Sequence, residues 1–145
     1  MKKVILSLVA FLLLLGALIF YSEFRTVNFV HAFLSDPEEL ADKVNGVTIW
    51  GEGGNGTVQT LATFNSSEEK YEEVIAALNE WEVKRTLFSK QDSSQDMYRI
   101  NLSNIEKPIN PYDILITSDG LLNIHGREYK LVDGPSIEDL IDIAK

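Results

Sequence analysis

The chain contains no cysteine among its 145 residues. Disulfides, thiol nucleophiles and cysteine metal ligands are therefore all excluded. A domain without disulfides has to be stabilised by its hydrophobic core alone. Histidine is nearly as scarce, since His31 and His125 are the two that occur and they lie far apart in the sequence. Zinc takes three or four protein ligands, so we expect no metal site.

Positive charge is also in short supply beyond residue 25. That part holds 10 Lys and Arg against 21 Asp and Glu, which gives a formal net charge of −11. A domain with this charge is not expected to bind nucleic acid, or to lie on an anionic membrane surface, through its net field. Solubility is the simplest role for so many acids.

One long hydrophobic run is present, and it lies at the start of the chain. Lys2 and Lys3 precede Val4 to Tyr21, in which only Ser7 and Gly16 are not strongly apolar. As a helix, these residues would span about 27 Å, close to the thickness of the hydrocarbon core of a bilayer. Leu12 to Leu15 would cover every face of that helix, unlike a helix of a soluble protein, which has a polar face.

The run could be a retained anchor or a cleaved signal peptide. It is longer than the usual apolar core of a cleaved signal, and large residues occupy the place where a small-x-small cleavage site would follow. We therefore predict a signal-anchor over residues 1–25, with the N-terminus cytoplasmic and the rest outside the membrane. The alternative is a secreted protein, for which Val30-His31-Ala32 is a tolerable but distant cleavage triplet.

The rest of the chain has the length of one domain. We expect a membrane-proximal connector over residues 26–35 and an α+β domain over residues 36–145, with a mostly antiparallel sheet of five to seven strands and two or three helices. Composition predicts strands near 47–50, 57–64, 83–88, 98–102, 113–117, 121–124 and 127–132. Helices are expected from Asp36-Pro37 to Asn45-Gly46, over residues 67–81 behind a capping box that starts at Ser66, and after a cap at Ser136.

Four glycines fall within six residues, in the order Gly51-x-Gly53-Gly54-Asn55-Gly56. The spacing matches a dinucleotide-binding loop, but that loop needs a helix directly after it, and Thr57 to Leu61 is typical of a strand. We therefore expect a hairpin turn, with no nucleotide and no other cofactor. The candidate partner-contact residues are Trp50, Gly51, Gly53, Gly54, Asn55 and Gly56. The loop could instead be a slack turn without function. A tryptophan at the end of a strand or helix more often completes the core, so we expect Trp81 in the core, and Trp50 could lie there too.

No catalytic constellation stands out. The Gly-x-Ser-x-Gly pattern of serine hydrolases is absent, and the helix dipole explains most of the acids near the last helix. We predict that the domain is not an enzyme but a binding or regulatory module for another cell-envelope component. The competing class is a small envelope hydrolase that uses scattered carboxylates.

Several short patterns lie between Gln59 and Lys145: Thr63-Phe64, Tyr98-Arg99-Ile100, Ile114-Leu115-Ile116, and Gly126 followed by Tyr129-Lys130-Leu131 and a closing amphipathic helix. In these the chain resembles small exported domains of unknown function, of the YhfM type, from spore-forming Gram-positive bacteria. Many such relatives look lipid-anchored through a cysteine, which this chain lacks. The resemblance implies a location in the cell envelope and supplies no catalytic residue.

Overall fold

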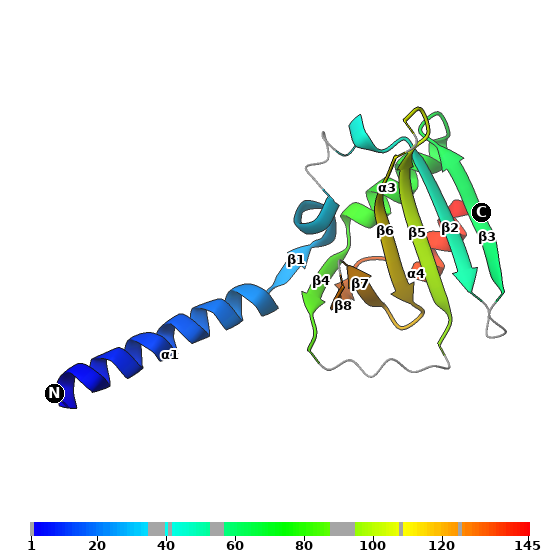
Figure 1. The fold of residues 1–145 in the computed structure, drawn as a ribbon. Coiled ribbons are helices and arrows are strands. Elements are labelled where there is room, and N and C mark those ends of the chain that lie inside the picture. Colours follow the sequence, from blue (N-terminus) through cyan, green and yellow to red (C-terminus); the bar gives the residue numbers. More distant parts are fainter. Residues whose placement is uncertain are drawn as a thin grey trace.

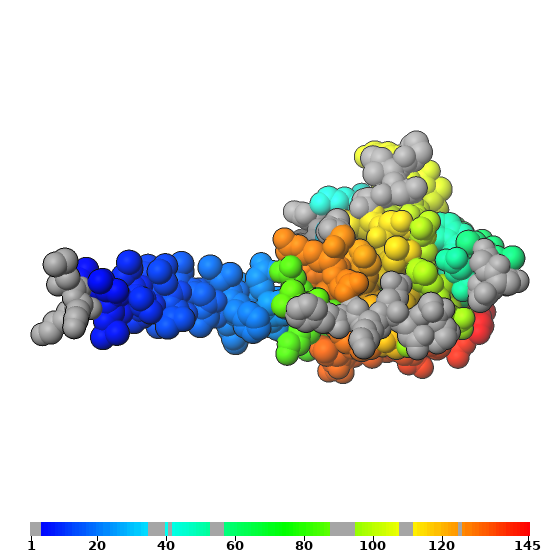
Figure 2. Space-filling view, turned by 60° about the horizontal axis from the view of Figure 1, so that its bottom comes forward, coloured from blue at the N-terminus to red at the C-terminus, as the bar shows by residue number. Residues whose placement is uncertain are grey.

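The structure, a computed structural model, describes residues 2–34, 40, 42–52, 57–87, 95–107, 109–124 and 126–145. Helix α1, Lys2–Phe24, projects away from a single folded unit (Figures 1 and 2). Within it Val4–Phe24 is long and apolar enough to cross a membrane, and its residues from Val4 to Tyr21 are all exposed. A signal sequence would have the same properties.

The domain is built on one sheet of eight strands in the order β1-β4-β8-β7-β6-β5-β2-β3. The elements are β1 Thr26–Asn28, the π-helix η1 Val30–Leu34, β2 Gly46–Glu52, β3 Val58–Asn65, α3 Glu69–Asn79, β4 Glu82–Arg85, β5 Met97–Asn104, β6 Ile109–Thr117, β7 Leu121–Ile124, β8 Arg127–Asp133 and α4 Ile137–Ala144.

Every pairing between neighbouring strands is antiparallel, which confirms the predicted α+β class with an antiparallel sheet. The predicted number of five to seven strands is wrong, because the sheet has eight. The additional strand is β1, whose Val27 pairs with Val83 of β4 at the edge of the sheet. Three residues are too few to show an alternating pattern, so the sequence gives no sign of this strand.

The core lies between one face of the sheet and the helices α3 and α4, which lie behind the sheet in Figure 1. Every second residue along the central strands points into it, including Val47, Ile49, Ile100, Leu102, Ile114 and Ile116. The helices contribute Tyr71, Val74 and Leu78 from α3, and Ile137, Leu140 and Ile141 from α4. Trp81 is fully buried, as predicted for a core residue.

The two helix starts differ in how well the sequence predicts them. Ser136 caps α4 as expected, since its side chain accepts from the Asp139 amide while the Asp139 carboxylate accepts from the Ser136 amide. The capping box predicted at Ser66 is wrong, because α3 begins at Glu69 without a side-chain cap. Asn65 organises that turn instead. Its side-chain oxygen accepts a hydrogen bond from the Ser67 backbone amide at 3.0 Å, and its backbone amide donates to the Glu68 carboxylate.

The segment expected as a connector, residues 26–35, includes β1 and η1. Phe29 and Val30 are buried in the core, where the Phe29 ring packs edge-on against Trp81 at 5.5 Å. The start of the next predicted helix, at Asp36-Pro37, lies outside the described residues. Its apolar face is represented by Leu40 and Val44, which are both buried.

Candidate functional site

The face of the sheet opposite α3 and α4 has no helix over it among the described elements (Figure 1). Strand register places the side chains of this open face in cross-strand rows. One row runs through Trp50, Arg99, Leu115, Asn123 and Glu128, on β2, β5, β6, β7 and β8. A second row runs through Val58, Glu52, Met97 and Thr117, and a third through Thr63, Thr48, Asn101 and Asp113.

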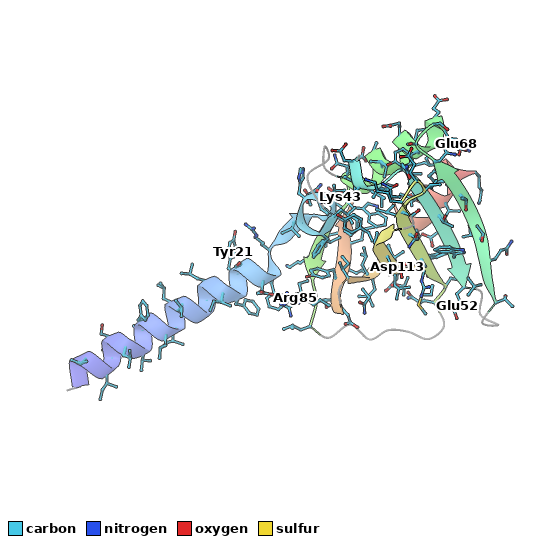
Figure 3. All side chains as sticks on the ribbon, turned by 45° about the horizontal axis from the view of Figure 1, so that its top comes forward. Tyr21, Lys43, Glu52, Glu68, Arg85 and Asp113 are labelled. Atoms are coloured by element: carbon cyan, nitrogen blue, oxygen red, sulfur yellow. The ribbon has the colours of Figure 1, made fainter. Side chains whose placement is uncertain are left out.

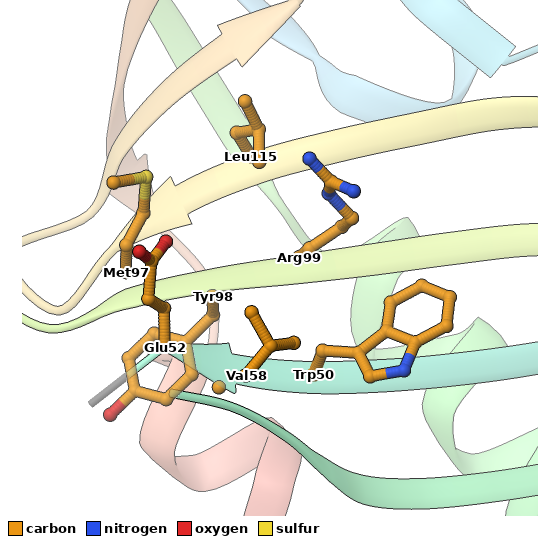
Figure 4. A pocket seen from close by; sticks show the side chains of 8 residues that line it. Trp50, Glu52, Val58, Met97, Tyr98, Arg99 and Leu115 are labelled. Atoms are coloured by element: carbon orange, nitrogen blue, oxygen red, sulfur yellow. The ribbon is translucent and has the colours of Figure 1, made fainter. Parts of the chain in front are cut away.

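The open face is hollowed beside Trp50 (Figure 4). The hollow, which we call the face hollow, has a volume of about 250 Å³. Its lining residues are Trp50, Gly51, Glu52, Val58, Met97, Tyr98, Arg99 and Leu115. The indole of Trp50 is half-buried rather than part of the core, so part of its apolar surface is exposed to solvent.

The arginine in the face hollow is well exposed. Arg99 is the direct cross-strand neighbour of both Trp50 and Leu115. Its Nε lies 3.7 Å from the Asp113 carboxylate, and 54% of its side chain is exposed. An ion pair this exposed contributes little to stability, so the guanidinium can be redirected to a ligand at small cost.

A β-bulge fixes the place of Trp50. Ile49 pairs with Ala62 while Trp50 pairs with Thr60, so Leu61 is the additional residue in β3. Bulges bend a strand and redirect its side chains. Packing explains why position 51 is a glycine, because a Cβ there would lie 3.0 Å from a methyl group of Leu61.

Two of the six residues predicted from the glycine-rich loop, Trp50 and Gly51, line the face hollow. Gly53, Gly54, Asn55 and Gly56 lie outside the described residues. The expected strand after this loop is present as β3, which begins at Val58. Sequence reasoning missed Met97, Arg99 and Leu115, although the alternation of Arg99 with Tyr98 and Ile100 already marked it as facing solvent.

A second hollow of about 520 Å³ lies between α4 and the edge formed by β2 and β3. Four acids line it, Glu52, Asp96, Glu138 and Asp142, together with Lys145 and Tyr98. Burial raises the pKa of the Tyr98 phenol, and the nearby charges of Glu138 and Asp96 raise it further. Within the described part of the chain, no group of three His, Asp or Glu side chains is arranged to hold a metal ion.

Comparison with known proteins gives no match for this chain among family models, curated proteins or solved structures.

Proposed function

We propose that the protein is a single-pass membrane protein whose domain outside the cytoplasm binds another component of the cell envelope through the open face of its sheet. The observation that carries the proposal is the row of Trp50, Arg99 and Leu115 across that face, with Met97 beside it. Trp, Arg and Met are enriched at protein interfaces, and the residues that dominate binding energy are enriched in Trp, Tyr and Arg.

The size of the face hollow favours a macromolecule over a small ligand. Pockets for small molecules usually have volumes of roughly 300–1,000 Å³ and enclose most of the ligand. At about 250 Å³, and open along the sheet, the face hollow accommodates a protruding side chain of a protein partner better than a whole metabolite.

Two carboxyls have lowered pKa values, and neither is suited to act as a general acid at neutral pH. A general acid that works at neutral pH needs a raised carboxyl pKa. The pKa of Asp119 is lowered, chiefly by its hydrogen bond from Thr117, and that of Asp139 is lowered by hydrogen bonds from Ser136. Both shifts are explained by turn and cap geometry.

Cleavage at the tolerable triplet Val30-His31-Ala32 would disrupt the fold, and this favours retention of α1. Cleavage after Ala32 would take Phe29 and Val30 out of the core and β1 out of the sheet. With Lys2 and Lys3 held in the cytoplasm, the domain would lie outside. Protease added to whole protoplasts should digest residues 46–145, and the undigested protein should fractionate with the membrane at full length. A shorter form in the medium would contradict retention, and protection of the domain would contradict the orientation.

Binding is tested by crosslinking the envelope of cells, solubilising it in detergent and isolating the full-length chain. Trp50→Ala and Arg99→Gln should each reduce the recovery of a specific partner by tenfold or more, on the order of the 1.4 kcal/mol or greater typical of such interface residues. Glu73→Gln, on the exposed side of α3, is the control and should leave recovery unchanged. Equal recovery with all three variants would contradict the proposal.

A further inference from the structure

The end of α1 is held against the edge of the sheet by arginines. Glu23 accepts a hydrogen bond from Arg85 of β4, and Arg127 of β8 lies 3.8 Å from the same oxygen. The Arg85 guanidinium also lies over the ring of Phe24, 5.7 Å from its centre. Figure 3 shows Arg85 beside the last turn of α1. The single acid of this turn is thus neutralised by two cations.

A second feature of the junction is the depth at which it would lie in a membrane. An apolar stretch from Val4 to Tyr21 spans about 27 Å, close to the full hydrocarbon thickness. Phe20, Tyr21 and Phe24 would then lie near the boundary, where aromatic side chains are enriched in membrane proteins. Arg25 and the adjacent sheet edge would follow at the depth of the lipid headgroups.

A hollow of about 690 Å³ opens at this point, which we call the junction hollow. Its lining is aromatic on the side of α1 and polar on the side of the sheet: Phe20, Tyr21, Phe24, Arg25, Thr26 and Lys84. Among the described residues neither Arg25 nor Lys84 forms an ion pair. The hollow therefore combines an apolar wall with two positive side chains that form no ion pair within the described part of the chain.

The distribution of charge over the domain contrasts with its net charge. Four basic residues gather at the junction, Arg25, Lys84, Arg85 and Arg127, although the part beyond residue 25 is strongly acidic overall. Acids concentrate on α3 and α4, and Glu68, just before α3, lies at the far side of the domain from α1 in Figure 3. The resulting asymmetry directs the basic end toward a negative surface and the acidic helices away from it.

We propose that the junction hollow binds the headgroup of an anionic phospholipid in the leaflet where α1 ends. Arg25 and Lys84 contact the phosphate, while Phe20, Tyr21 and Phe24 contact the glycerol and the upper acyl chains. The contact fixes the orientation of the domain relative to the membrane. Because it is local, it is compatible with the repulsion that we expect between an anionic membrane and the acidic remainder of the domain surface. The proposal rests on the proposed membrane anchor.

The test reconstitutes the full-length chain in phosphatidylcholine vesicles that contain traces of spin-labelled phosphatidylglycerol or spin-labelled phosphatidylcholine. Electron paramagnetic resonance then gives the relative association constant of the two lipids with the protein. Each Lys or Arg near an anionic headgroup contributes about a fivefold preference. The wild type should therefore prefer phosphatidylglycerol by about fivefold or more, and this preference should weaken as salt is added.

The double variant Arg25→Gln/Lys84→Gln should lower the preference severalfold, and Lys84→Gln alone should lower it less. The contribution of Lys2 and Lys3 at the other headgroup region is the same in every variant. Lys107→Gln removes the same charge from an exposed turn of the domain and should leave it unchanged. A wild type without preference, a double variant that keeps it in full, or an equal loss in Lys107→Gln would each overturn the proposal. Extraction of the vesicles with alkaline carbonate tests the anchor separately. A protein that is anchored but has no lipid preference would stay with the vesicles, whereas an unanchored protein would be released.

Discussion

The indole Nε1 of Trp81 donates a hydrogen bond of 2.8 Å to the carbonyl oxygen of Pro135. This bond connects the end of α3 to the turn that precedes α4, across 54 residues of sequence. Gly134 packs against the Trp81 ring beside this hydrogen bond. Its φ is +103°, and the absence of a side chain allows the close approach. The two helices that cover the sheet are thus fixed to each other where the indole is buried.

Gly134→Ala should destabilise the domain by about 2–4 kcal/mol, from left-handed backbone strain and overpacking together. A Cβ at this position would lie 2.9 Å from both the Glu80 carbonyl oxygen and the Trp81 ring. Gly126→Ala is the matched control, because its φ is +76° but nothing lies within 4 Å of its Cβ, so strain alone should cost about 1 kcal/mol. Denaturant unfolding measures both, and equal losses would contradict this account of Gly134.

Tyr71→Phe should cost about 1–3 kcal/mol, the usual penalty for a buried acceptor left without its donor. The Tyr71 hydroxyl donates to the Val44 carbonyl at 2.7 Å within the core. Burial, and then the charge of Glu72, raise the pKa of this phenol above 10.0. The stability contributed by Tyr71 is therefore complete below about pH 10 and is lost as the pH rises through the folded-state pKa. Unfolding curves of wild type and variant should converge in that alkaline range, and a constant difference would contradict it.

Thr117→Val should raise the pKa of Asp119 toward 3.8. The Thr117 hydroxyl donates to the Asp119 carboxylate, and Lys130 lies 3.2 Å from it; both hold its pKa below the ordinary value. Because the folded-state pKa is lowered, this stabilisation is present above about pH 3.8 and is lost as the pH falls through the folded-state value. Carboxyl carbon chemical shifts measured across the acid range report the change. Lys130→Gln should move the pKa in the same direction, and an unmoved pKa in both variants would contradict the assignment.

Phe29→Ala should destabilise the domain by about 3–5 kcal/mol, as expected for a fully buried aromatic residue. A chain that begins at residue 26 should fold, whereas one that begins at residue 33 should not, because it lacks β1, Phe29 and Val30. Near-ultraviolet circular dichroism of the two shortened chains distinguishes the outcomes. A folded chain from residue 33 would restore cleavage after Ala32 as a workable route to a secreted form.

Local pattern was sufficient for much of this fold. The turn at Gly120 and the alternation through β5 predict antiparallel strands, and Ser136 with its acid three residues later predicts the start of α4. What local pattern could not supply is pairing at long range. Nothing in the sequence places β2 beside β5 or β1 beside β4, since both pairings close long loops and depend on the whole core.

The candidate site likewise could be predicted only where it depends on residues that are neighbours in the sequence. Trp50 could be singled out as an aromatic residue next to a glycine-rich turn, but its neighbours Arg99 and Leu115 come from strands that only the folded sheet brings alongside. The junction follows the same rule, because Glu23 and Arg85 are 62 residues apart in the sequence. Because the chain as a whole is acidic, its composition does not predict the basic cluster that folding brings together at one end of the domain.

Contact between the open face and a partner can be tested by a photoreactive amino acid placed in the full-length protein in living cells. At Thr60, an exposed position paired with Trp50, it should give a discrete crosslinked product that disappears when Trp50→Ala is added. At Ala76, exposed on α3 behind the sheet, it should not give that product. The same product from both positions, or a Thr60 product that persists in Trp50→Ala, would contradict the account.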